Sequence, residues 1–270
     1  MPKIRLWSEF VPFKKLESLL DLIKSYDIEP SIALNENEVS KSKDLLRKLY
    51  QKGIDCSIWP TLEKGYFVNP STVTSFVRYL HSISRLLKEN TSISTIVFDL
   101  EPPINVSKKS IKINWNDPKK DILRSKQKAQ NILQQLVEEI QDDWKKYVLT
   151  TEPYGLNFDL PIPTNAKRHS ILAYSSFIPK SKTNYINQTI EYGKRNYGKN
   201  VEIDLGATSP GILANVPGLN EMIYRNPDRL TQEIRILKQN SIQKIGVYAL
   251  DGMLNDTENW FKELTRAWNI

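Results

Sequence analysis

Short apolar runs alternate with longer amphipathic stretches along the chain. The apolar runs have the length and the β-branched content of strands, and the stretches between them repeat leucine and isoleucine at helical spacing. Strands are predicted at 3–10, 30–35, 55–60, 94–103, 146–153, 169–177, 201–211 and 244–252. Helices are predicted at 13–26, 38–53, 69–90, 117–144, 183–197, 226–241 and 256–268. The connection at 154–168 is rich in Pro and Asn, which predicts a loop.

This alternation predicts an α/β fold with a parallel sheet, and eight strands with a helix after most of them predict a closed (β/α)8 TIM barrel. The length of 270 residues suits one such barrel, and no linker or internal repeat divides the chain. We therefore expect residues 1–270 to form a single barrel domain. An open doubly wound sheet is the alternative, but the phosphate-binding glycine fingerprint that such sheets often contain is absent.

The fourth predicted strand ends with two carboxylates, in the sequence TIVFDLEPP at residues 95–103. Side chains alternate between the faces of a strand, so Asp99 and Glu101 point to the same face, about 6 to 7 Å apart at the backbone. Burying a carboxylate is costly unless it is paired or used. Helix capping does not explain the pair, because two prolines and a long loop precede the next helix. The charge on one carboxylate raises the pKa of the other, which suits a general acid.

Acids and aromatic residues also end other predicted strands or lie in the loops beside them. The carboxyl ends of the strands form the active-site mouth of such a barrel, so these side chains are candidates for a substrate site. The acids are Glu9, Glu152, Asp204 and Asp251, and the aromatic residues are Trp59, Tyr66, Tyr154, Tyr174 and Tyr248. Each also has an ordinary explanation, because acids after strands often cap helices and single aromatic residues often pack in the core.

Glu152 is the candidate for a second catalytic carboxylate, because its strand neighbours the strand of Glu101. Two carboxyl groups about 5 to 5.5 Å apart suit a retaining glycosidase, and a wider separation suits an inverting one. The aromatic residues suit a carbohydrate groove, because sugars stack their apolar faces on rings.

The Asp-x-Glu in FDLE, at residues 98–101, resembles the end of the catalytic motif of family 18 glycoside hydrolases, the chitinase-type enzymes. In that family the Glu protonates the glycosidic oxygen and the Asp orients the N-acetyl group of the substrate. The resemblance therefore implies these roles for Glu101 and Asp99. It also implies that Tyr174, in AYSSF, lies beside the acetyl group. IGVYALDGM is similar to the last strand of the family's barrels, which usually carries a Trp on the sugar-binding floor, and here Tyr248 lies in that region.

Family 25 lysozymes close their fourth strand with a similar Asp-x-Glu. The chain departs from both families at upstream positions. The chitinase motif has further aspartates where this chain has Ser94, Thr95 and Val97, and the lysozyme aspartate of strand one is replaced by Ser8 and Glu9.

Composition narrows the chemistry further. A single cysteine, Cys56, excludes an internal disulfide and a cysteine-based zinc site, and two histidines argue against a histidine-rich metal site. No metal and no cofactor are expected. The net charge is +7, but the lysines are spread along predicted helices, so a solvated basic face is expected in preference to a functional anion-binding patch, and no nucleic-acid partner is expected.

The location and assembly of the protein are also matters of expectation. No run of about twenty apolar residues is present, so no membrane span is expected. The start of the chain has no signal-peptide core, so the chain as written is cytoplasmic, and a secreted or envelope protein follows only if a leader has been removed. A monomer is expected.

Three functions are open at this point. The first is a glycoside hydrolase in which Glu101 acts as general acid on an oligo- or polysaccharide. The second is a divalent-metal-dependent sugar isomerase or lyase that uses Asp99, Glu101, Glu152 and Asp204 as oxygen ligands. Barrel metalloenzymes of this kind usually add His or Lys at strand ends, and none is obvious here. The third is a catalytically silent carbohydrate-binding barrel. Of the three, the sequence favours the glycoside hydrolase.

Overall fold

The computed structural model describes residues 4–62, 67–102, 104–107, 110–113, 119–155, 160–177, 184–209 and 222–269. Among these residues, parallel strands close into a barrel in the order β1-β10-β9-β8-β7-β4-β3-β2. These strands are β1 (Ile4–Ser8), β2 (Ile28–Leu34), β3 (Cys56–Pro60), β4 (Ile93–Asp99), β7 (Tyr147–Pro153), β8 (Arg168–Leu172), β9 (Val201–Gly206) and β10 (Ile245–Tyr248). The predicted α/β class and (β/α)8 TIM barrel are confirmed.

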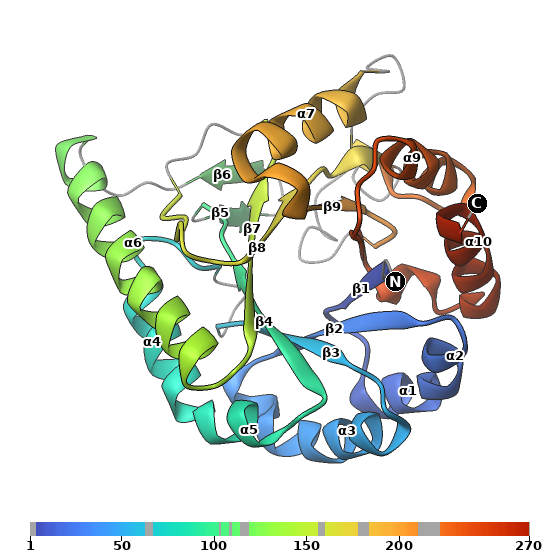
Figure 1. The fold of residues 1–270 in the computed structure, drawn as a ribbon, viewed down its shortest axis with the longest axis horizontal. Helices are drawn as coiled ribbons and strands as arrows, with labels where there is room; N and C mark the ends of the chain where they lie inside the picture. The colour runs from blue at the N-terminus through green and yellow to red at the C-terminus, as the bar shows by residue number, and fades with distance from the viewer. Residues whose placement is uncertain are drawn as a thin grey trace. The chain divides into compact units, whose positions relative to one another are not determined.

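Helices flank the strands, as Figure 1 shows. They are α1 (Phe13–Ser18), α2 (Leu20–Ser25), α3 (Val39–Lys52), α4 (Val73–Ser82), α5 (Ser84–Glu89), α6 (Lys119–Asp142), α7 (Tyr185–Tyr197), α9 (Asp228–Gln239) and α10 (Thr257–Asn269). None of the helices in the described part is long and apolar enough to cross a membrane. The described residues of the connection 154–168 contain no helix, as expected for a loop.

Two of the predicted helices are each interrupted once. The stretch 13–26 breaks at Leu19, and the stretch 69–90 breaks at Ile83. The backbone N–H of Leu19 bonds to the carbonyl three residues earlier, that of Leu16, at 3.0 Å, and the N–H of Ile83 is shared between the carbonyls of Leu80 and Tyr79, both at 3.2 Å. Such a bond tightens the turn and interrupts the regular α-helical ladder, which the spacing of apolar residues does not reveal.

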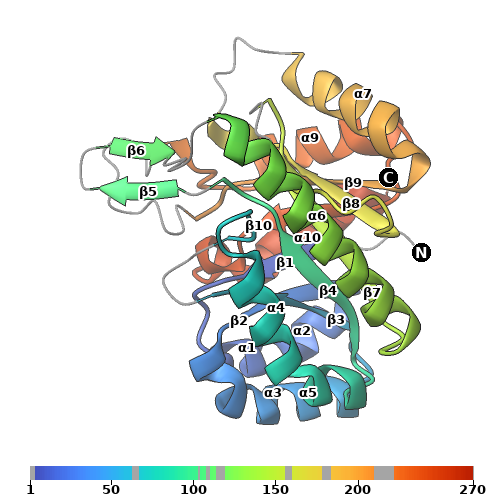
Figure 2. The ribbon, with the colours of Figure 1, turned by 90° about the vertical axis from the view of Figure 1, so that its left-hand side faces the viewer.

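A two-stranded antiparallel sheet of β5 (Ile104–Ser107) and β6 (Ser110–Ile113) lies where the sequence predicted only a loop. Figure 2 shows this pair standing out from α4 and α6. Its sequence signal is the alternation of Ile104 and Val106, then Ile111 and Ile113, with polar residues between them.

Several strands end earlier than predicted, and β8 and β9 are shortened most. β8 ends at Leu172 instead of residue 177, and β9 ends at Gly206 instead of residue 211. In β8 the reason is local, because Tyr174 takes a left-handed backbone conformation with φ of 45° and a short 3-10 helix, η3 (Ser175–Phe177), follows it. An extended strand cannot continue through such a residue.

The barrel comprises two compact units, Met1–Ile32 with His169–Ile270, and Ala33–Arg168. The assignment of residues 1–270 to one domain stays a prediction.

The strands of the first unit present an apolar face to the helices and a polar face to the barrel interior. A Cβ built on Gly193 of α7 would lie 2.8 Å from Val201 and 3.4 Å from Ile171, so those two side chains face α7. The residues that alternate with them, among them Glu202 and Asp204, therefore face inward. The inner face of this unit is polar, although its strands are buried.

Buried ion pairs fill the inner face of the first unit. Arg5 of β1 bonds to Glu29 of β2 at 2.9 Å and to Glu202 of β9 at 2.6 Å. The three residues are 2%, 6% and 1% exposed. Charges that are removed from water need such partners, so this cluster fixes how β1, β2 and β9 are placed against one another.

Candidate functional site

The pair Asp99 and Glu101 lies at the end of β4, in the second unit. The ring of Phe98 packs edge-on against Phe76 of α4, with ring centroids 5.1 Å apart, so Phe98 faces the helices. Asp99 therefore faces the barrel interior. A bridge between Val68 and Leu100 keeps the chain extended beyond the strand, which places Glu101 on the same face as Asp99. Both carboxylates are buried, at 6% exposure each.

Two neighbouring strands hold the carboxylate of Asp99. The hydroxyl of Thr151 on β7 donates to its Oδ1 at 2.6 Å, in agreement with the pairing of Asp99 and Thr151 in the parallel ladder. The indole of Trp59 on β3 also donates to it. Burial raises the pKa of Asp99 to about 6, and these two hydrogen bonds lower it in part. Asp99 therefore exchanges a proton close to neutral pH.

The register of β7 places Glu152 differently from Thr151. Residues alternate along this strand to Pro153, so Glu152 lies on the face of Thr150, which pairs with Phe98. Glu152 is buried, at 8% exposure. The expected approach of Glu152 to Glu101 stays a prediction, and the register argues against it. Tyr154, directly after the strand, is half-buried, and Tyr66 lies outside the described residues.

Three predicted residues of the first unit gather at the ends of β1 and β10. The hydroxyl of Tyr248 donates to the carboxylate of Glu9. The carboxylate of Asp251 accepts hydrogen bonds from the backbone N–H of Phe10 at 2.8 Å and of Glu9 at 3.4 Å. Burial raises the pKa of Asp251, and these backbone hydrogen bonds oppose the shift. Asp251 thus anchors the loop after β1.

Phe10, in that anchored loop, is an aromatic residue that the sequence analysis passed over. Its side chain is 55% exposed, which is unusual for a phenylalanine, and its backbone is held by Asp251. The signal that could have found it is its position directly after Glu9 at the end of the first strand.

Asp204 lies deeper in the first unit, beside the buried ion pairs. Its carboxylate occupies space over Gly246 of β10, where an added Cβ would lie 1.6 Å from Oδ1. Burial raises the pKa of Asp204 to about 7, the positive charge of Arg5 opposes this, and the negative charge of Glu202 adds to it. At 2% exposure, Asp204 is an interior group in this structure.

Asp204→Asn is expected to remove part of the pH dependence of stability. The folded-state pKa of Asp204 lies above the ordinary Asp value of 3.8. Its favourable contribution is therefore complete below about pH 4 and is lost as pH rises through about 7. Between pH 5 and pH 8 the parent should lose about 1 to 3 kcal/mol more unfolding free energy than the variant.

Urea unfolding of both proteins at the two pH values measures this difference. Below about pH 4 the two proteins should be close in stability, because Asp204 is then protonated in both the folded and the unfolded parent and a protonated Asp and an Asn are alike in charge and size. A stability gap of the same size at pH 5 and pH 8 would show that Asp204 does not titrate in this range.

Tyr174 follows β8 in the left-handed conformation described above and is half-buried. The N–H of Phe177 bonds to its carbonyl at 3.0 Å, and the rings of the two residues lie 6.2 Å apart. Within the described ranges, no three His, Cys, Asp or Glu side chains form a group that could hold a metal ion.

Comparisons with known proteins show the fold and no family. No protein-family model matches the sequence, and no curated protein matches it. Among solved structures, the PgaB (BpsB) glycoside hydrolase domain from Bordetella bronchiseptica is similar over 98% of both chains, with 10% identity and a TM-score of 0.60. The GH18 chitinase ChiB of Flavobacterium johnsoniae is similar over 98% of this chain and 93% of its own, with 13% identity and a TM-score of 0.59.

A sugar epimerase shares the same barrel. The D-allulose 3-epimerase from Methylomonas sp. is similar over 98% of this chain and 95% of its own, with 14% identity and a TM-score of 0.51. The predicted resemblance to glycoside hydrolase barrels is thus confirmed as a likeness of fold, and fold alone does not select one chemistry.

Proposed function

We propose that this protein is a glycoside hydrolase-like enzyme, a single barrel domain over 1–270 that cleaves a glycosidic bond with Glu101 as general acid. The observation that supports this most is the placement of Asp99 and Glu101 on one inward face at the end of β4. Both are buried, yet neither can act as a helix cap at that position. The substrate is an oligo- or polysaccharide.

The two carboxyl groups have different roles in this proposal. Glu101 gives its proton to the oxygen of the leaving sugar, because it stands at the rim beyond the strand end. Asp99 is held by Thr151 and Trp59, and its raised pKa lets it donate or accept a hydrogen bond near neutral pH. Asp99 thereby orients a polar substituent of the sugar, such as an N-acetyl group.

The register of β7 bears on which group acts as the nucleophile or base. Glu152 was the sequence candidate for nucleophile or base, but alternation turns it toward the face of Thr150. A substrate whose own acetamido oxygen attacks the anomeric carbon needs no second protein carboxylate. We therefore favour an N-acetylated sugar, and Glu152→Gln should slow such a reaction less than Glu101→Gln.

The substrate-binding residues in this proposal lie around the strand ends. They are Trp59, Tyr66, Tyr154, Tyr174, Tyr248, Asp204, Asp251 and Glu9. Asp251 acts through the loop that it anchors. Turnover assays with chito- and gluco-oligosaccharides of equal length test the proposal. Cleavage of the chito-oligosaccharide at a faster rate supports it, and cleavage of neither would contradict it.

Activity is expected to survive EDTA, because carboxylates and the substrate perform the chemistry. The epimerase likeness makes the metal-dependent sugar isomerase the alternative to test. Rates measured before and after chelation, and again after Mg²⁺ or Mn²⁺ is added, separate the two. Loss of activity in EDTA, followed by recovery of activity when either ion is added, would favour the metal-dependent sugar isomerase.

A further inference from the structure

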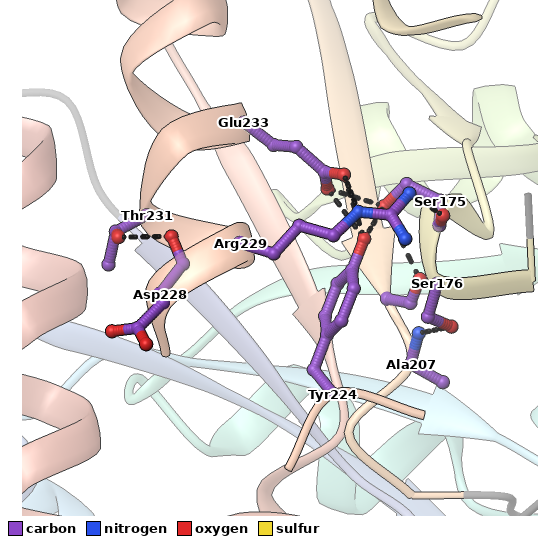
Figure 3. A network of polar contacts seen from close by, with 9 residues as sticks. Ser175, Ser176, Ala207, Tyr224, Asp228, Arg229, Thr231 and Glu233 are labelled. Atoms are coloured by element: carbon purple, nitrogen blue, oxygen red, sulfur yellow. Dashed lines mark hydrogen bonds and ion pairs between the residues drawn. The ribbon is translucent and has the colours of Figure 1, made fainter. Parts of the chain in front are cut away.

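A buried polar cluster surrounds Glu233 of α9, outside the strands that carry the candidate site (Figure 3). Glu233 is 6% exposed, and three side chains donate to its carboxylate. Ser175 donates from Oγ at 2.7 Å, Tyr224 from its hydroxyl at 2.8 Å, and Arg229 from Nε at 3.1 Å. We refer to Ser175, Tyr224, Arg229 and Glu233 as the α9 cluster.

The α9 cluster fixes the turn that follows Tyr174. Besides the bond from its hydroxyl to Glu233, Ser175 accepts a hydrogen bond at its carbonyl from Arg229 Nη2 at 2.8 Å. Arg229 also lies over the ring of Tyr224, 5.3 Å from its centroid. The residue directly after Tyr174 is therefore held at both its side chain and its backbone by α9.

The same cluster reaches the ends of β9 and β10. The N–H of Tyr224 bonds to the carbonyl of Ala207 at 2.8 Å, and the N–H of Ala207 donates to Ser176. Next along the chain, the N–H of Thr208 bonds to the carbonyl of Tyr248 at 2.8 Å. Tyr174 and Tyr248 are thus both attached to one network of hydrogen bonds.

Tyr174 needs such support because its backbone is left-handed, a conformation that residues with a Cβ disfavour. Without this support, the backbone of Tyr174 would relax out of the left-handed conformation, and the ring of Tyr174 would move. The burial of Ser175 and Glu233, at 1% and 6% exposure, means that water cannot replace the bonds that α9 supplies.

We propose that Glu233 is a positioning residue that fixes Tyr174, through Ser175 and Tyr224, at the place where it meets a sugar ring. The proposal rests on the proposed function in one respect, that Tyr174 contacts the substrate. Glu233 itself touches no substrate and takes no part in proton transfer. Its removal should therefore weaken binding and leave the chemical step nearly unchanged.

Glu233→Gln tests this, because it keeps the size of the side chain and alters the acceptor that two hydroxyls and a guanidinium share. KM for a chito-oligosaccharide should rise at least about tenfold, with kcat within about threefold of the parent. The dissociation constant, measured in a Glu101→Gln background that does not consume the ligand, should rise equally. Gln232→Ala is the control, because Gln232 is exposed on the same helix.

Amide hydrogen exchange supplies a readout that requires no substrate. In Glu233→Gln, exchange at Phe177 and Ala207 should accelerate relative to the parent and to Gln232→Ala, and Tyr224→Phe should have the same effect. Unchanged exchange would overturn the positioning role whatever the kinetics show. Faster exchange with unchanged KM and dissociation constant would overturn the link to sugar binding. A parent that neither binds nor cleaves any glycan refutes the proposed function instead, and the link to sugar binding falls with it.

Discussion

Glu101→Gln is expected to slow the hydrolysis of a glycan with a poor leaving group by at least about a hundredfold, because general acid help contributes about 10² to 10⁴ in rate. The substitution keeps the shape of the side chain and removes the proton that the leaving oxygen needs. An activated aryl glycoside leaves without much protonation, so its cleavage should fall less. Steady-state kinetics with both substrates measure the two effects.

Asp99→Asn is the matched control, because Asp99 lies on the same face and is equally buried. It should reduce the rate less than Glu101→Gln and should change the acidic limb of the pH profile, since it removes a group with a pKa of about 6. Equal rates for the parent and Glu101→Gln on both substrates would show that Glu101 is not the acid. Glycan binding by a parent without turnover would favour the silent carbohydrate-binding barrel.

Arg5→Met is expected to cause the largest loss of stability, about 3 to 5 kcal/mol, because it leaves buried negative charges without a partner. Arg5 bonds to both Glu29 and Glu202, and all three are almost fully buried. Methionine fills much of the volume of the arginine stem, so the loss reports the unpaired charges more than a cavity. Chemical denaturation at neutral pH measures it.

Arg47→Met is the control for this effect. Arg47 pairs with Asp44 at 3.0 Å, but the two side chains are 62% and 73% exposed. Solvent screens such a pair, so its loss should cost less than about 1 kcal/mol. If both variants lose a similar small amount of unfolding free energy, the carboxylates of Glu29 and Glu202 must be stabilised by other partners or by water.

The fold could be predicted from the sequence because each barrel strand is an apolar run between helical patterns. Every barrel strand overlaps its predicted range, whereas β5 and β6 were not predicted. The strand ends were not predicted, because a backbone feature such as the left-handed conformation of Tyr174 after β8 is not encoded in the spacing of apolar residues. The break at Leu19 depends on one tight turn, which apolar spacing does not encode.

The candidate site was predicted in part. The shared face of Asp99 and Glu101 follows from alternation within one strand, so sequence sufficed. The donors Thr151 and Trp59 come from neighbouring strands, and only the register between strands selects them. The same limit applies to Glu152, whose distance from the pair in space the sequence cannot fix.

The buried charges are visible in the sequence as charged residues inside or beside apolar strands, but the sequence does not show that they form one group. Arg5 stands in a predicted strand, Glu29 lies directly before one, and Glu202 is the second residue of another. Pairing these three requires the order of the strands around the barrel, in which β1 lies between β2 and β10 and β9 follows β10. The partners of Glu233 are equally hard to predict from the sequence, because only its bond to Arg229 joins residues that are close along the chain.

The central claim is that the side chain at position 101 meets the scissile glycosidic oxygen. A crystal structure of the Glu101→Gln variant with a bound chito-oligosaccharide tests it most directly, because this variant should hold the substrate without cleaving it. The account predicts the glycosidic oxygen within hydrogen-bond distance, about 2.6 to 3.2 Å, of the amide at position 101. A sugar bound elsewhere on the barrel, with no glycosidic oxygen near that side chain, would contradict it.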